Sequence, residues 1–270
     1  MSVAHTAQHA TTVGPAVLVP LVAGWCYLAA VLRQREPDRP GWSHWRTAAF
    51  AAGCALLAVA LLLPADGFAA HMWQHLLLGM LAPLGLVLGA PGTLLLRTVD
   101  RRVGRAALRA LRHPVARTLA HPVTGLLLTA GGLWLLYLTP LYRATLASPV
   151  LHDLVNLHFL LSGLLFTWSI AGPEPYRHRA SVPVRLVVLG AAVVAHASLA
   201  QLLYAGLLVD VPAPPQALRA GAAVMYYGGD AAEILLALAL LASWRPQPRR
   251  APAPAAASGV KRGPLLYLRR

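Results

Sequence analysis

Seven apolar runs, most of them about 20 residues long, limit what this chain can fold into. They lie at about 13–33, 46–64, 70–90, 121–140, 151–171, 183–209 and 217–244. A helix of about 20 apolar residues crosses the hydrocarbon core of a bilayer. Only 12% of the residues are charged, which is about half the fraction in soluble domains. We therefore predict an all-α polytopic membrane protein, a bundle of seven transmembrane helices over 13–244.

The basic residues fall on alternate loops. All 23 Lys and Arg residues except Arg143 and Arg219 lie in the first, third and fifth loops or in the C-terminal tail. Basic loops are retained in the cytoplasm. We therefore expect the N-terminus outside the cell and the C-terminus in the cytoplasm.

Three segments flank or interrupt the predicted spans. Residues 1–12 are expected to form a polar N-terminal tail, and residues 245–270 a disordered basic tail rich in Pro and Ala. In the segment 93–112, arginines recur every fourth residue and apolar residues fall on another face. This pattern is typical of a helix that lies on an anionic membrane surface. Membrane lipids are thus predicted partners, and nucleic acid is not, although the formal net charge is +14.

Ionisable side chains inside spans are costly to bury, so each is a candidate functional group. His71 and His75 open the third apolar run four residues apart, and helical spacing puts them on one face. His152 and His158 lie in the fifth run, and His196 lies in the sixth. With the predicted orientation, all of these imidazoles fall in the outer half of the membrane.

These residue types favour a metal site. Imidazole suits copper, zinc and iron, and a thioether such as that of Met72 favours Cu(I). We predict a copper site, for Cu(I), with ligands drawn from His71, Met72, His75, His152, His158 and His196.

Three carboxylates share this predicted depth, namely Asp153, Asp230 and Glu233. A carboxylate that accepts a hydrogen bond from an imidazole fixes its tautomer. We expect these groups either to position histidines in this way or to relay protons.

The third run also resembles a known family. His71-Met72-Trp73-Gln74-His75, followed by Ala82-Pro83 and Gly89-Ala90-Pro91, is similar to the core motif of CtaG-like cytochrome c oxidase assembly proteins. Further similar segments are His121-Pro122, Thr139-Pro140-Leu141-Tyr142, His152-Asp153 to His158, Gly172-Pro173 and Tyr227-Gly228-Gly229-Asp230. The resemblance covers roughly residues 15–245. It implies a multi-pass protein of the bacterial plasma membrane that assembles a haem-copper oxidase of the caa3 type, with oxidase subunits as partners and a part in copper delivery.

Two other functions stay open at this point. One is a copper or proton transporter, with His196, Asp230 and Glu233 as a relay. The other is a membrane cytochrome that binds haem without covalent attachment. The chain is not expected to be an enzyme, because it contains no GxSxG, HExxH or phosphate-binding glycine motif. The sequence does not indicate an oligomeric state.

Overall fold

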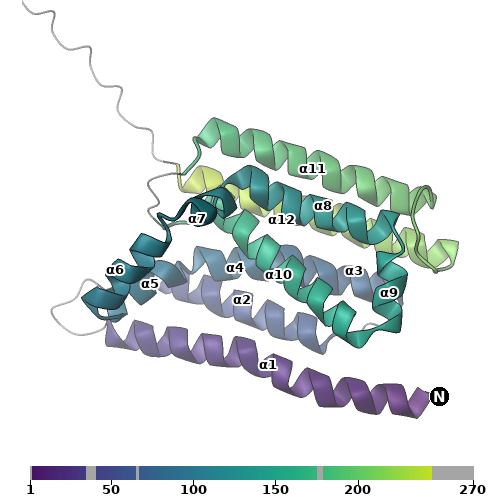
Figure 1. The fold of residues 1–270 in the computed structure, drawn as a ribbon, viewed down its shortest axis with the longest axis horizontal. Coiled ribbons are helices and arrows are strands. Elements are labelled where there is room, and N and C mark those ends of the chain that lie inside the picture. Colours follow the sequence, from purple (N-terminus) through teal and green to yellow (C-terminus); the bar gives the residue numbers. More distant parts are fainter. Residues whose placement is uncertain (1, 35–40, 65–66, 175–178, 245–270) are drawn as a thin grey trace, which may run out of the picture.

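The computed structural model describes the backbone of residues 2–34, 41–64, 67–174 and 179–244, and side-chain burial from residue 17 onward. Every described element is a helix, and the long helices run side by side in one bundle (Figure 1). In chain order they are α1 (Ser2–Arg33), α2 (His44–Leu62), α3 (Phe68–Leu76), η1 (Leu77–Leu81), α4 (Ala82–Leu88), α5 (Pro91–Thr98), α6 (Arg101–Ala110), α7 (Pro114–Leu119), α8 (Pro122–Leu138), α9 (Leu141–Ala147), α10 (Pro149–Ala171), α11 (Val182–Ala205) and α12 (Pro215–Ala242).

Five of these segments are long and apolar enough to cross a membrane, namely α2, the continuous segment α3-η1-α4, α10, α11 and α12. A sixth candidate is α8 with α9, which meet at an angle of 77°. In α1, the apolar stretch among the residues with described side chains is Val17–Arg33, whose 17 residues are fewer than in the five candidate spans. The all-helical membrane architecture is thus confirmed with five or six candidate spans, whereas seven spans and the orientation of the termini stay predictions.

The outer surface of the bundle carries large apolar side chains. Val19 on α1 is 62% exposed, Leu127 on α8 is 66% exposed and Val187 on α11 is 72% exposed. Water would disfavour so many exposed aliphatic groups, whereas lipid tails solvate them. The bundle therefore has the surface of a protein in a lipid bilayer.

The α3-η1-α4 segment is the central span. Of the residues in its apolar stretch, 61% are buried, a larger share than in any other candidate span. The segment packs against α2, α10 and α12. Its middle turn, η1, is π-helical and directly precedes Pro83. Proline has no N–H to donate and its ring clashes with the carbonyl four residues earlier, here that of Gly79. The wider π turn accommodates this clash within one continuous span.

Glycines allow the neighbouring helices to approach this span closely. Gly163 on α10 lies against the carbonyl group of Gly79 and the ring of Pro83. Gly53 on α2 and Gly85 on α4 face each other backbone to backbone, so that a Cβ on either would overlap the other helix. Small residues at such crossings are typical of membrane helix packing.

The basic segment at one end of the bundle differs from its prediction. The helix expected at 93–112 is two helices, α5 and α6, separated at Val99 and Asp100. The Asp100 carboxylate accepts a hydrogen bond from the Arg102 N–H at 2.7 Å, which caps the start of α6. An aspartate is favoured at an N-cap over a helix interior, so it begins a new helix here.

The predicted N-terminal and C-terminal tails can be compared with the structure only in part. Residues 2–12 are polar, as expected of the tail, but they form the first turns of α1, in keeping with their high alanine content. The predicted tail at 245–270 lies outside the described residues.

Candidate functional site

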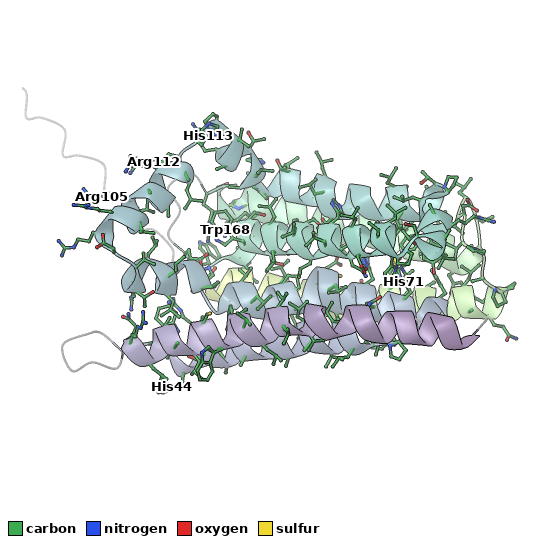
Figure 2. All side chains as sticks on the ribbon, turned by 60° about the horizontal axis from the view of Figure 1, so that its bottom comes forward. His44, His71, Arg105, Arg112, His113 and Trp168 are labelled. Atoms are coloured by element: carbon green, nitrogen blue, oxygen red, sulfur yellow. The ribbon has the colours of Figure 1, made fainter. Side chains whose placement is uncertain are left out.

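His71 and His75 lie on α3, one helical turn apart, and both are buried with 7% of their surface exposed. Figure 2 shows His71 toward the end of the bundle that is opposite to the basic side chains of Arg105, Arg112 and His113. The two histidines that open the central span are thus enclosed by neighbouring helices and do not face lipid.

His71 shares a hydrogen-bonding group with Met72. The hydroxyl of Tyr137, on α8, lies 3.1 Å from His71 Nε2 and 3.7 Å from Met72 Sδ. Because a phenol has one proton, donation to the thioether requires that His71 Nε2–H donates to the phenol oxygen, leaving His71 Nδ1 as an acceptor. Tyr137 and Met72 are both fully buried. One hydroxyl therefore fixes an imidazole and a thioether side by side.

Aromatic rings enclose His71 on its other sides. The Tyr142 ring, on α9, has its centre 5.1 Å from that of His71, and the Phe68 ring centre is 6.4 Å away. The His152 ring, at the start of α10, has its centre 6.1 Å from that of His71. The structure thus brings two of the predicted ligands, from α3 and α10, next to each other.

The loop between α11 and α12 covers this end of the site. The Asp210 N–H donates to the carbonyl of Tyr137 at 2.9 Å, and the Asp210 carboxylate pairs with Arg143 of α9 at 2.5 Å. Val211 is buried in the same apolar cluster as Tyr137 and Met72. The loop therefore packs directly on the residues that surround His71.

His75 lies one turn deeper than His71. The edge of the His75 ring packs on Phe159 of α10, with ring centres 4.4 Å apart. The next residue, Leu76, packs on Gly228 of α12, and the His196 ring packs on the neighbouring Gly229. His75 therefore sits between the cluster at the mouth and a second polar pair deeper in the bundle.

The deeper pair joins α11 and α12. His196 Nδ1 lies 3.7 Å from Glu233 Oε1, and both side chains are more than nine-tenths buried. The His196 ring rests on Gly229, one turn before Glu233, where a Cβ would overlap it. Glu233 Oε2 has no hydrogen-bond partner among the residues described. Glu233 thus lies near His196, but the distance of 3.7 Å is longer than a hydrogen bond, and its role in orienting that imidazole stays a prediction.

The other predicted site residues lie apart from the cluster around His71. His158 Nε2 is 3.1 Å from the carbonyl oxygen of Leu128, and its ring packs on Gly132, both on α8. Asp153 is exposed on α10, and Asp230 is half-buried near Glu233. The roles of these residues as ligand or relay stay predictions.

The donor set around His71 limits which metal would fit. In the described ranges no group of three or more His, Cys, Asp or Glu side chains could hold a metal ion. Two imidazoles that bind one ion from opposite sides at about 2 Å have ring centres roughly 6 Å apart, and the His71 and His152 centres are 6.1 Å apart. Imidazoles and a thioether are donor types that suit Cu(I), so His71, His152 and Met72 are the candidate donors for the predicted copper site.

Two residues of this site were not predicted from the sequence. Tyr137 and Tyr142 both contact His71, yet neither was expected to take part. A signal existed for Tyr137, because a buried tyrosine in an apolar span needs a partner for its hydroxyl. Tyr142 was noted only as part of a motif at the end of the fourth apolar run.

The chain is similar to proteins of three mycobacteria. An uncharacterized protein of Mycobacterium leprae is 33% identical over 193 residues, and uncharacterized proteins of Mycobacterium bovis and Mycobacterium tuberculosis are each 34% identical over 194 residues. The alignments cover 66% of this chain but 28% of each relative, so the chain spans less than a third of their length. No solved structure matches. The sequence model of the cytochrome c oxidase caa3 assembly factors matches residues 25–247, most of the chain. The chain therefore belongs to the cytochrome c oxidase caa3 assembly factor family.

Proposed function

We propose that this protein assists the assembly of a haem-copper oxidase in the bacterial plasma membrane, and that it binds Cu(I) beside His71 for delivery to oxidase subunits. The observation that carries the copper part is the buried cluster in which the Tyr137 hydroxyl contacts both His71 and Met72, with the His152 ring alongside. Family membership supports the assembly part.

The chemistry of this cluster suits a carrier. A thioether and neutral imidazoles favour Cu(I) without adding negative charge to an apolar environment. The donors come from α3 and α10, and the loop carrying Asp210 and Val211 covers them. If that loop moved, the ion would have a route out of the cluster, and the spanning helices could stay in place.

The depth of the cluster suits exchange at the outer face. His71 lies near the start of the central span, and the basic helices lie at the other end of the bundle (Figure 2). If basic segments stay in the cytoplasm, the cluster faces the outside of the cell. Copper acquired outside the cytoplasm would then reach this cluster without crossing the bilayer.

Titration of the purified full chain with Cu(I) under anaerobic conditions, against a chromogenic Cu(I) chelator, tests the copper part. We expect the chain to bind about one Cu(I), since the cluster has a single set of soft donors. The double variant His71→Ala/His152→Ala should lose this binding. Met72→Leu should weaken it while keeping the buried volume nearly constant.

His158→Gln is a matched control, because it removes one imidazole of α10 whose Nε2 lies at the Leu128 carbonyl. It should bind copper like the parent chain. Loss of binding in this variant, or unchanged binding in the double variant, would contradict the site. For the assembly part, a deletion strain should contain less active oxidase, and full oxidase activity without the protein would refute that part separately.

One observation favours a second function, transport of protons or copper through the bundle. His75 lies one turn below His71 on α3, and deeper in the bundle His196 Nδ1 lies 3.7 Å from Glu233 Oε1. These groups form a line of ionisable side chains along the bundle. Proteoliposomes containing the chain should show proton or copper flux if this line conducts, and Glu233→Gln should abolish that flux.

A further inference from the structure

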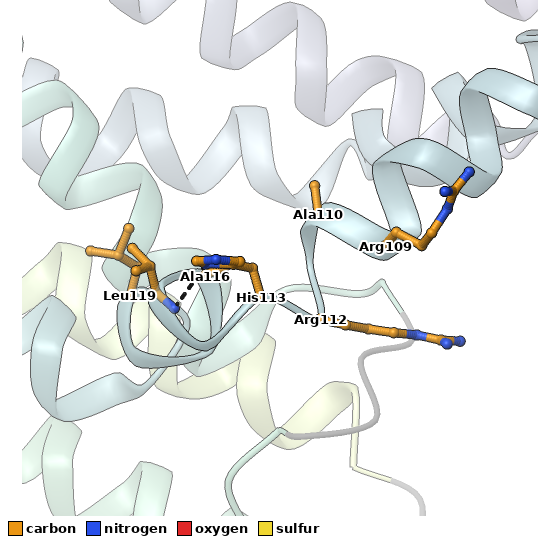
Figure 3. A pocket seen from close by; sticks show the side chains of 7 residues that line it. Arg109, Ala110, Arg112, His113, Ala116 and Leu119 are labelled. Atoms are coloured by element: carbon orange, nitrogen blue, oxygen red, sulfur yellow. Dashed lines mark hydrogen bonds between the residues drawn. The ribbon is translucent and has the colours of Figure 1, made fainter.

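A shallow groove lies between α6 and α7 at the basic end of the bundle (Figure 3). Its volume is about 570 Å³, and its lining combines basic and apolar side chains, namely Arg109, Ala110, Arg112, His113, Val115, Ala116 and Leu119. A second hollow of about 450 Å³, on the side of α6 that faces α5, has the same mixed lining, formed by Leu96, Arg101, Gly104, Arg105 and Leu108. Helix α6 is thus flanked by two hollows that each offer cationic and apolar contacts.

The basic residues of α5, α6 and α7 far outnumber the acidic residues near them in the sequence. The segment 97–117 contains seven arginines and one acidic residue, Asp100. The Asp100 carboxylate caps α6. The Nε groups of Arg105 and Arg109 donate to carbonyls one turn earlier on the same helix, at 3.3 Å and 3.4 Å. Among the described residues, no hydrogen bond or ion pair involves their terminal guanidinium nitrogens, so these nitrogens are available to an anion.

The apolar part of the lining is exposed. Val115 is 59% exposed, Leu119 is 43% exposed and Leu108 is 45% exposed. A nucleic acid or a free phosphate ion would satisfy the arginines but would leave these aliphatic groups in water. An anionic phospholipid satisfies both, because it joins a phosphate to hydrocarbon chains.

The groove also lies at the level where lipid headgroups begin. Helices α5, α6 and α7 connect the end of the central span, at Leu88, to the start of α8, at Pro122. Figure 1 shows the three short helices gathered at this end of the bundle. A segment that joins two adjacent span ends lies at the membrane surface.

We propose that the groove between α6 and α7 binds one anionic phospholipid, with its phosphate at Arg109 and Arg112, beside the end of α6, and an acyl chain along Val115 and Leu119 of α7. This proposal does not depend on copper binding at the opposite end of the bundle. It assigns α6 and α7 the role of a lipid site that holds this end of the bundle against an anionic leaflet.

Native mass spectrometry of the detergent-purified full chain tests the proposal, with phosphatidylglycerol and phosphatidylcholine as probes. We expect one phosphatidylglycerol to be retained in preference to phosphatidylcholine. The variant Arg109→Gln/Arg112→Gln should retain it roughly tenfold less, since each basic group at an anionic surface contributes severalfold to affinity. Val115→Ser should also weaken retention, because it makes the acyl contact polar.

Arg102→Gln/Arg117→Gln is the matched control, since both arginines are exposed on the same two helices but do not line the groove. It should retain the lipid within about twofold of the parent chain. Equal losses of lipid retention in the two variants would show that diffuse charge attraction, and not a specific site, holds the lipid. That result would overturn the proposal. Absence of any preference for phosphatidylglycerol would also overturn it, as would displacement of the lipid by millimolar inorganic phosphate.

Discussion

Replacement of Gly163 by alanine puts a methyl group where α10 crosses the π-helical turn. The new Cβ would lie 2.9 Å from the carbonyl carbon of Gly79 and 3.1 Å from Cγ of Pro83, and closer still to the carbonyl oxygen. Ordinary contact begins at 3.4 Å, so the methyl group must move by half an ångström to clear the carbonyl carbon and by more than one ångström to clear the oxygen. Because the obstacles are backbone atoms and a proline ring, no side-chain rotation relieves the overlap.

The expected cost follows from this geometry. Forcing an extra methylene into a packed core costs typically 1–3 kcal/mol. A loss of about 2 kcal/mol corresponds to a fall in Tm of roughly 4–8 °C for a chain of this size. Since His152 lies on α10 and His71 lies on the span that Gly163 contacts, copper affinity should fall together with stability.

Thermal unfolding in detergent, followed by tryptophan fluorescence, measures the effect. The matched control is Gly190→Ala, because a Cβ at Gly190 on α11 meets nothing within 4 Å. Both changes replace a helical glycine with alanine, so the gain in helix propensity of about 1 kcal/mol cancels between them. If Gly163→Ala unfolds within about 1 °C of Gly190→Ala, the close crossing of α10 and the central span is refuted.

Three further changes test contacts elsewhere in the bundle. Gly229→Ala should displace the His196 ring, and a change in the histidine signals of a nuclear magnetic resonance spectrum would reveal it; unchanged signals would contradict the contact. Arg185→Met removes the donor to the Ile170 carbonyl, at 2.6 Å. It should lower stability by about 1–3 kcal/mol in denaturant unfolding, so an unchanged midpoint would show that the bond is dispensable. Tyr27→Phe removes a hydroxyl that donates to the buried Gly89 carbonyl and accepts from the half-buried Trp42 indole N–H, and should cost about 1–2 kcal/mol, whereas equal or higher stability would rule this out.

The helices of the bundle were largely predictable from the sequence. Bilayer thickness fixes the length of a span, so each apolar run coincides with one or more helices in the structure. The interruptions were not predictable in the same way. Asp100 is the N-cap of a new helix inside a regular repeat of arginines. Because the repeat continues across Asp100, it predicted one uninterrupted helix. The bend of 77° between α8 and α9 falls at Thr139 and Pro140, where the fourth apolar run was predicted to end, but the run itself does not indicate the angle.

The site was predictable in depth but not in lateral arrangement. Counting residues from the end of each span places His71 and His152 at a similar level, and the structure brings them together. Six residues separate His152 from His158, which puts their side chains about 120° apart around α10. Both nevertheless belong to one predicted ligand set, whereas in the structure His158 contacts the Leu128 carbonyl of α8. Which helix faces His71 depends on packing, so Tyr137 emerged only from the structure.

The π-helical turn at Leu77–Leu81 sets the angular offset between the two halves of the central span. One additional residue in a turn rotates everything beyond it by roughly 100° about the helix axis. The half that carries His71 and His75 packs mainly on α12, whereas the half beyond Pro83 packs mainly on α2. A single helix thereby serves two neighbours with different faces, and removal of one residue from the turn would swing the histidines away from their pocket without changing any side chain in it.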